Sequence, residues 1–133
     1  ANGGVMMEPK LVRQITGAAG IPRLRASGGA YKRVMSEATA KIVGEYMRET
    51  VENGTGKKAR VSGYTVCGKT GSAETSNDKS VSTNAWFVGY IQDASCPYAV
   101  AVVLEQAGAG GDLAATLAAK CLAEAVELVG GQG

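Results

Sequence analysis

The first regular pattern in the chain is a set of apolar residues that recurs every three or four positions, as in a helix with one buried face. This stripe comprises Ile42, Val43, Tyr46, Met47, Thr50 and Val51. Ser36 precedes the stripe and can accept hydrogen bonds from the free N–H groups of a first helical turn. Gly44 weakens the interior, and we expect it to permit close packing. We therefore predict an amphipathic helix over residues 36–53, with Asn53-Gly54 as a left-handed stop.

A second helical pattern lies near the end of the chain. Asp112 can cap its first turn, and the glycines Gly130-Gly131 can end it. The apolar residues of this pattern are Leu113, Leu117, Leu122, Val126 and Val129, and alanines between them widen the face. We predict a helix over residues 112–129 that packs against a sheet.

The stretch between the two helices is rich in β-branched and aromatic residues, which favour strands. Three strand-like segments cover residues 60–71, 85–92 and 98–106. The short connector 93–97 predicts that the last two pair as an antiparallel hairpin. Residues 74–84, between the first two segments, form a polar loop of Ser, Thr, Asn and Asp.

The first 35 residues mix apolar and polar positions without a clear period. Residues 5–15 contain Pro9, which favours an edge strand. Residues 16–22 are turn material, and a second extended piece near 22–26 is expected to pair back as a hairpin.

Together these elements predict one α+β domain: a small hairpin region, an amphipathic helix, an antiparallel three-stranded meander and a terminal helix packed on the meander. Their expected bounds are residues 1–35, 36–53, 60–106 and 112–129.

Composition narrows the classes of function. Apolar residues make up 45% of the 133 residues and charged residues 20%, as in globular proteins. The net charge is +2 and the basic residues are scattered along the sequence, so nucleic acid is not an expected partner. There is no histidine, which excludes mechanisms based on Ser-His-Asp or Cys-His and all histidine metal sites.

The three cysteines, Cys67, Cys96 and Cys121, lack the Cys-x-x-Cys spacing of a zinc site. We interpret them as small buried hydrophobic residues, and we expect neither a metal nor a cofactor. No apolar run is long enough to span a membrane.

One segment carries chemistry that can be read in two ways. Residues 63–70 satisfy the pattern G-x-x-x-x-G-K-[ST], which is typical of the phosphate-binding loop of nucleotide hydrolases. That function requires a curled loop before Lys69 and a helix after it. The residues between the glycines, Tyr64 to Cys67, favour a strand instead, so a nucleotide binder is the alternative interpretation.

The second reading takes Lys69 to Gly71 as the end of an exposed strand that borders a site. Here the sequence resembles the Lys-Thr-Gly box of penicillin-binding proteins, the peptidoglycan D,D-transpeptidases. The resemblance extends over the whole chain in order and spacing. The matching stretches are residues 1–5 with Pro9, 51–56, 69–74 and 85–90. It implies the C-terminal part of a transpeptidase domain with a partial penicillin-binding/β-lactamase-like fold, of class B rather than class A.

The resemblance also implies roles for four residues. Lys69 supplies positive potential and hydrogen bonds toward a substrate carboxylate and a neighbouring serine. The hydroxyls of Thr70 and Ser72 hold that carboxylate, and the backbone N–H of Ser72 supplies half of an oxyanion hole. Gly71 leaves room for the substrate along the strand edge.

The family's nucleophile lies in a Ser-x-x-Lys motif, and a Ser-x-Asn motif accompanies it; both precede the Lys-Thr-Gly box. Ser76 to Lys79 and Ser82 to Asn84 match these patterns by letter, but they follow the box in a polar loop, so we reject both. We therefore expect the chain to be a fragment that is inactive alone, with the nucleophile upstream of Ala1.

By the same resemblance, the partners are peptidoglycan stem peptides, β-lactams and the N-terminal remainder of the domain. The expected location is the extracytoplasmic face of the bacterial cytoplasmic membrane. Apolar surface that the remainder would cover predicts self-association or a swapped dimer of the fragment. A non-catalytic module that binds a peptide carboxylate is a further alternative.

Overall fold

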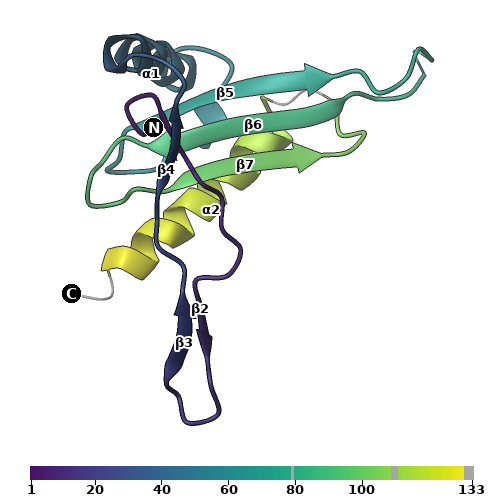
Figure 1. The fold of residues 1–133 in the computed structure, drawn as a ribbon. Coiled ribbons are helices and arrows are strands. Elements are labelled where there is room, and N and C mark those ends of the chain that lie inside the picture. Colours follow the sequence, from purple (N-terminus) through teal and green to yellow (C-terminus); the bar gives the residue numbers. More distant parts are fainter. Residues whose placement is uncertain (79, 109–110, 131–133) are drawn as a thin grey trace. The chain divides into compact units, whose positions relative to one another are not determined.

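The computed structural model describes residues 1–78, 80–108 and 111–130, and the chain forms two compact units (Figure 1). Residues 2–41 make up one unit, and Ala1 with residues 42–133 makes up the other. The larger unit contains a sheet of three strands, β5 (Val66–Ala73), β6 (Asn84–Ile91) and β7 (Ala99–Leu104), and the terminal helix α2 (Leu113–Gly130). The α+β class and the three-stranded meander are therefore confirmed.

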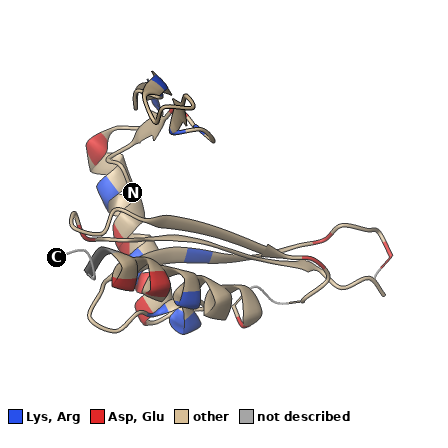
Figure 2. Cartoon of the chain, turned by 90° about the horizontal axis from the view of Figure 1, so that it is seen from below, with Lys and Arg blue, Asp and Glu red and all other residues tan. Residues whose placement is uncertain are grey.

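The sheet is antiparallel in the order β5-β6-β7, and its side chains alternate between two faces. One face is covered by α2 (Figures 1 and 2). That face supplies most of the core. Its buried members are Val66, Ala85, Phe87, Ile91 and Val102. On the opposite face, Trp86, Val88 and Val103 are between 39% and 45% exposed.

The terminal helix packs on the sheet as expected, but through different residues. Leu113 and Leu117 are exposed, whereas Ala114, Ala115 and Ala118 are fully buried beside Leu122. The prediction that the leucines mark the buried face is thus wrong at its first two positions. Small side chains bring the helix axis close to the sheet, and Phe87 fills the space between them. Val126 packs against the core, and the side chain of Val129 lies outside the described part, as does Gly131.

Helix α1 (Glu37–Glu52) confirms the first predicted helix. Ser36 caps it, because the Thr39 N–H donates to the Ser36 Oγ at 3.1 Å. The predicted apolar stripe is not a buried face, however. Its only fully buried member is Val51, and the exposed ones include Ile42, Val43 and Tyr46. Gly44 does permit close packing, since a Cβ there would lie 2.7 Å from the Tyr90 hydroxyl oxygen.

The segment after α1 turns back sharply. Gly54 does not have the left-handed conformation that we predicted, since it is not among the described residues with positive φ. Its role is close approach: a Cβ on Gly54 would lie 2.9 Å from the Thr50 carbonyl oxygen. A short 3-10 helix, η1 (Lys57–Ala59), follows. The first predicted strand begins later than expected, at Val66, because residues 61–64 form a turn around Gly63 at φ +80°.

The smaller unit consists mainly of an arm of four short strands. These are β1 (Val5–Met7), β2 (Gln14–Thr16), β3 (Pro22–Arg25) and β4 (Ala30–Arg33). β2 pairs with β3, which confirms the hairpin, and β1 pairs with β4, which the sequence did not predict. The predicted strand over residues 5–15 is interrupted between Met7 and Gln14.

Cys67 and Cys96 are buried and Cys121 is exposed, and all three are free thiols. The prediction of burial therefore holds for two of the three. Within the described ranges, we find neither a helix with the length and hydrophobicity of a membrane span nor a cluster of potential metal ligands.

Candidate functional site

The Lys-Thr-Gly segment lies in the middle of β5, a strand at the edge of the sheet. β5 pairs with β6 through all eight of its residues, with Lys69 opposite Val88 and Thr70 opposite Phe87. Among the described strands it has no second neighbour. Its outer edge therefore presents the kind of backbone N–H and C=O row to which an extended peptide can add.

Strand alternation separates the four candidate site residues into two pairs. Lys69 and Gly71 point to the face opposite α2, whereas Thr70 and Ser72 point to the same side as Phe87. Lys69 is exposed, and its Nζ donates to the Thr70 carbonyl oxygen at 2.6 Å. Ser72 is exposed and Gly71 is half-buried. The edge thus carries one cation and one accessible hydroxyl within four residues.

The Thr70 hydroxyl is held from within the fold. Thr70 is only 9% exposed, and its Oγ1 lies 2.6 Å from Oγ1 of Thr55. Thr55 belongs to the connector after α1, which packs close to the start of α2: a Cβ on Gly111 would lie 2.8 Å from the Thr55 carbonyl oxygen. Lys58 and Asp112 form an ion pair at 2.7 Å across the same junction. The connector is thereby fixed against both α2 and β5.

Sequence reasoning did not identify Thr55. The residue lies 15 positions before Thr70, so no local pattern joins the two. The available signal was its position between Gly54 and Gly56, which marks a tight connector. Gly56 also sits close to the end of α1, because a Cβ there would lie 3.2 Å from the Thr50 carbonyl oxygen.

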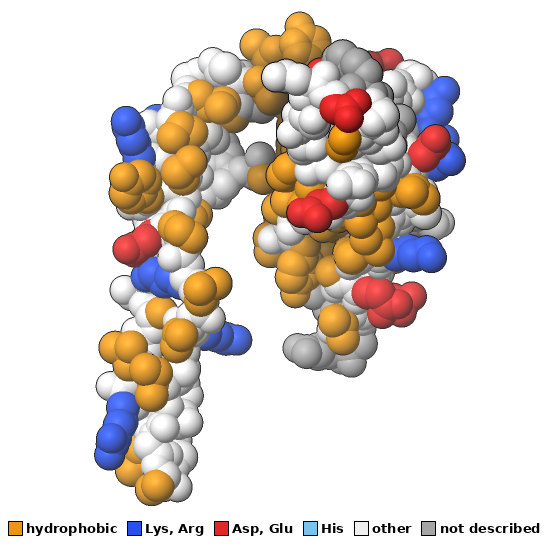
Figure 3. All heavy atoms as spheres, turned by 90° about the vertical axis from the view of Figure 1, so that its right-hand side faces the viewer, with side chains coloured by type: hydrophobic (Ala, Val, Ile, Leu, Met, Phe, Trp, Pro, Cys, Tyr) orange, Lys and Arg blue, Asp and Glu red, His pale blue; other side chains and the backbone are white. Residues whose placement is uncertain are grey.

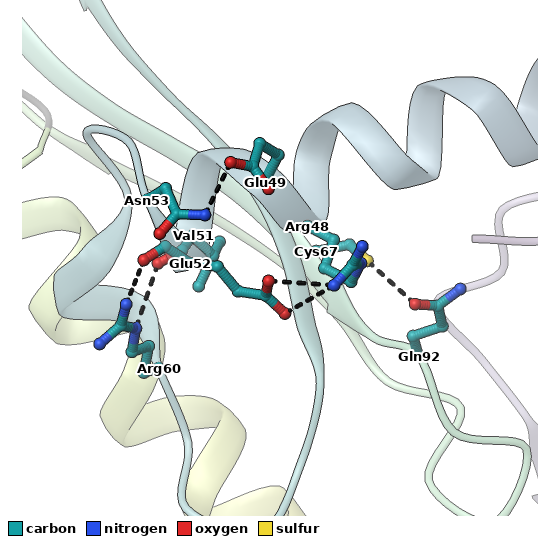
Figure 4. Close-up of polar contacts among 8 residues, drawn as sticks. All are labelled: Arg48, Glu49, Val51, Glu52, Asn53, Arg60, Cys67 and Gln92. Carbon is teal, nitrogen blue, oxygen red and sulfur yellow. Dashed lines mark hydrogen bonds and ion pairs between the residues drawn. The ribbon is translucent and has the colours of Figure 1, made fainter.

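The connector that precedes β5 is tied to the end of α1 by hydrogen bonds from Arg60 (Figure 4). Arg60 donates to the backbone carbonyl oxygens of Val51 and Glu52, which would otherwise lack partners at the helix end. Arg48 forms an ion pair with Glu52 at 3.0 Å, one helical turn away. These contacts fix the point from which the chain enters the strand of Lys69.

A second polar contact lies at the same end of the sheet. The Cys67 thiol donates to Gln92 Oε1 at 3.6 Å (Figure 4), and burial raises the pKa of this thiol. Burial, followed by hydrogen bonding with Cys67, raises the pKa of Tyr90 to about 12. Both groups are therefore neutral at physiological pH, and neither is poised as a nucleophile or base.

The structure contradicts the phosphate-loop interpretation of residues 63–70. Val66 to Thr70 is extended and paired with β6, so no loop curls toward Lys69. The strand continues to Ala73, and no helix begins after the lysine. The geometry needed to cradle a phosphate is absent from this segment.

The two rejected serine motifs lie in a loop and at a strand start. The Ser76 Oγ accepts a hydrogen bond from the Asp78 N–H in a non-helical turn. Lys79, the last member of that pattern, lies outside the described residues. Asn84 begins β6, and its Oδ1 accepts a hydrogen bond from the Gln106 N–H at 2.9 Å. Neither segment has the helical form that a Ser-x-x-Lys site needs.

Comparison with known proteins identifies the family. Residues 1–123 match the family described as penicillin binding protein transpeptidase domain. Over 93 residues, 70% of this chain, the sequence is 30% identical to penicillin-binding protein 2a of Streptococcus pneumoniae serotype 2. The match covers 13% of that protein's length.

Solved structures give the same result over a longer span. The D,D-transpeptidase domain of a peptidoglycan glycosyltransferase from Eggerthella lenta matches 100% of this chain at 34% identity and a TM-score of 0.80, and 30% of that domain's chain is covered. Penicillin-binding protein A of Mycobacterium tuberculosis, solved as an imipenem acyl-enzyme complex, matches 95% of this chain at 29% identity and a TM-score of 0.77. The match covers 28% of that protein's chain.

The chain therefore spans less than a third of each of these relatives. The alternative of a nucleotide binder finds no support in them, nor does that of a non-catalytic module. With its edge strand, its Lys-Thr-Gly segment and a family match over most of its length, the chain belongs to the penicillin-binding protein transpeptidase family.

Proposed function

We propose that this chain forms one wall of the active site of a serine D,D-transpeptidase that cross-links peptidoglycan stem peptides. The observation that carries the proposal is the outer edge of β5, which pairs with no second strand among the described residues and which includes Lys69 to Ser72, in a chain of this family. In the proposed reaction a serine attacks the penultimate D-Ala carbonyl, D-Ala leaves, and an acyl-enzyme forms. An amine of a second stem peptide then takes the acyl group and releases the serine.

In this proposal the edge of β5 receives the substrate as an added strand. The Lys69 ammonium attracts the carboxylate of the terminal D-Ala, and the Ser72 hydroxyl donates to it. The Ser72 N–H stabilises the oxyanion that develops on the attacked carbonyl. Gly71 supports this arrangement, because a side chain there would project beside the substrate.

Thr70 is proposed to donate its hydroxyl proton to the same carboxylate. The hydroxyl has one proton and can accept a second hydrogen bond. If Thr55 donates to the Thr70 oxygen, the proton of Thr70 remains available for the ligand. Either hydroxyl can donate in this contact of 2.6 Å, and the proposal assigns the donor role to Thr55.

The serine nucleophile is proposed to lie in the remainder of the domain, so the chain alone is expected to be inactive. β-Lactams are proposed ligands of the assembled site, because relatives are known as acyl-enzymes with imipenem and penicillin G. The remainder of the domain would cover the exposed face around Trp86, Val88 and Val103. Without it, we expect that face to promote self-association or a swapped dimer.

The proposed location is the extracytoplasmic face of the bacterial cytoplasmic membrane, where stem peptides are cross-linked. Assignment to class B rather than class A stays a prediction, and so do the residue bounds 1–35, 36–53, 60–106 and 112–129 of the sub-regions.

The absence of a nucleophile can be tested on the chain itself. After incubation with a labelled penicillin, intact-mass spectrometry should find the unmodified mass. A stoichiometric adduct that maps to Ser76 would show that the chain carries its own nucleophile, and would contradict the proposal.

A further inference from the structure

The arm formed by β1 to β4 has almost no core of its own. Its two sheets each contain two strands, and every strand residue except Val5 is exposed. A two-stranded hairpin without a packed face is marginally stable in water. The side chains of the arm therefore contribute little to the folding of this chain.

Half of the basic residues of the chain lie in its first unit. Residues 2–41 contain seven Lys or Arg and two acidic residues, Glu8 and Glu37, so this unit has a net charge of +5. Since the whole chain carries +2, the remaining residues carry −3. Most charged positions along the arm are Lys or Arg (Figure 2). The arm is therefore a cationic surface on a protein that is otherwise slightly acidic.

Large aliphatic side chains accompany these charges. Leu11 is fully exposed, Ile21 is 68% exposed and Leu24 is 55% exposed. In the β2–β3 ladder, Ile15 lies opposite Leu24 on one face, and Gln14 lies opposite Arg25 on the other. The Arg25 Nε donates to Gln14 Oε1 at 3.1 Å, which confirms that these two share a face. Figure 3 shows hydrophobic and basic side chains next to each other along the arm.

We propose that this arm binds the headgroup region of an anionic lipid bilayer. Cations close to such a surface are attracted by its negative potential, and exposed Leu and Ile gain free energy when they leave water. Arg and Lys can keep their charged ends among the headgroups while their aliphatic stems lie deeper. The unpaired edges of two-stranded sheets exclude insertion into hydrocarbon, where backbone groups would lack partners, so the arm lies at the interface.

Two other anionic partners fit less well. A glycan strand with acidic stem peptides would pair with the basic side chains. The apolar residues of the arm, however, are aliphatic except for Tyr31, and such side chains gain most free energy on transfer from water into hydrocarbon. An acidic protein surface would satisfy the charges too, but the hollow in the arm is lined by Arg13, Gln14, Arg25 and Ala26, which suits a small anion such as a lipid phosphate better than the large apolar anchor of a protein partner. The bilayer accounts for both the charge and the aliphatic side chains.

The test uses vesicles of phosphatidylcholine with about 30% phosphatidylglycerol at low ionic strength, and neutral vesicles of phosphatidylcholine alone. The chain should sediment with the anionic vesicles only. Arg13→Gln/Arg25→Gln should weaken this binding by roughly 25-fold, at about 5-fold per cation. The matched control Lys57→Gln/Lys120→Gln removes the same charge from exposed positions outside the arm and should change binding by less than about 3-fold.

A second variant, Leu11→Ser/Ile21→Ser, alters exposed side chains and leaves the fold and the charge intact. It should reduce the binding that persists at about 0.5 M salt, where electrostatic attraction is screened. The proposal is overturned if the chain does not bind anionic vesicles, or if the arm and control variants weaken binding equally. Binding to purified peptidoglycan sacculi without binding to vesicles would assign the arm to the glycan and would also overturn it. None of these outcomes depends on transpeptidase activity.

Discussion

The substitution Gly68→Ala tests how closely the strand of the candidate site packs on the core. Gly68 precedes Lys69 and lies opposite Gly89 on β6. The Phe87 ring, fully buried, crosses both glycines. A Cβ on Gly68 would overlap the Phe87 Cζ and lie 2.9 Å from Cε2, and a Cβ on Gly89 would lie 2.7 Å from Cε1. The ring has no solvent-exposed position to move to.

Overpacking of this kind costs about 2–3 kcal/mol, because side chains or backbone must shift. That cost is a large fraction of the roughly 5–15 kcal/mol that stabilises a typical domain. Urea unfolding followed through the fluorescence of Trp86, the only tryptophan, measures it. We expect Gly68→Ala to lower the free energy of unfolding by this amount.

Gly71→Ala is the matched control in the same strand. Its Cβ would lie 3.4 Å from the Trp86 Cβ, an ordinary contact, so the expected change is within about 0.5 kcal/mol. Phe87→Leu should relieve part of the penalty of Gly68→Ala, which gives a coupling of about 1 kcal/mol or more in a double-mutant cycle. Equal costs for the two glycine substitutions would refute the packing argument.

Three further predictions concern the polar contacts and thiols. Thr55→Val should lower the free energy of unfolding by about 1 kcal/mol through loss of the bond to Thr70, whereas Thr55→Ser should retain it; urea titration of both variants checks this. The pKa of Tyr90, raised to about 12 from its ordinary 10, favours the folded state below pH 10, and this stabilisation is lost as the pH rises from 10 to 12. The free energy of unfolding should therefore fall more steeply over that range in the wild type than in Tyr90→Phe. A thiol reagent should label only Cys121 in the folded protein and all three cysteines in urea; rapid native labelling of more than one would contradict the burial of the other two.

The sequence predicted most elements of the larger unit, because period and composition determine them. It did not predict which face of α2 is buried. Leucine has the larger hydrophobic gain, but Ala114, Ala115 and Ala118 allow the helix to approach a sheet that already contains the Phe87 ring. How closely a helix packs depends on the shape of the surface that it packs against. The periodic pattern of the helix sequence carries no information about that surface.

The arm was predicted only in part for a related reason. β4 reads Ala-Tyr-Lys-Arg and has no apolar alternation, because neither of its faces is buried. Its pairing with β1 connects residues far apart in the chain, such as Met6 and Lys32. A strand that is exposed on both sides leaves no hydrophobic signal.

The position of the candidate site was predicted from the resemblance of Lys69 to Glu74 to a known box. The hydrogen bond that holds Thr70 in place was not predicted. It joins Thr55 and Thr70 only because the connector after α1 folds back between α2 and β5. The exposed stripe of α1 was likewise misread as a core face, because the apolar period alone does not distinguish a core face from an exposed one.

Penicillin labelling of a chimera tests whether this chain forms a wall of a transpeptidase site. In the chimera, residues 1–133 replace the matching 30% of the Eggerthella lenta D,D-transpeptidase domain. We expect the folded chimera to form a covalent adduct with labelled penicillin. We also expect Lys69→Ala to slow adduct formation by about 100-fold or more, while Lys57→Ala does not. A folded chimera that is not labelled, or one whose labelling is unaffected by Lys69→Ala, would contradict the claim that this chain forms a wall of the site.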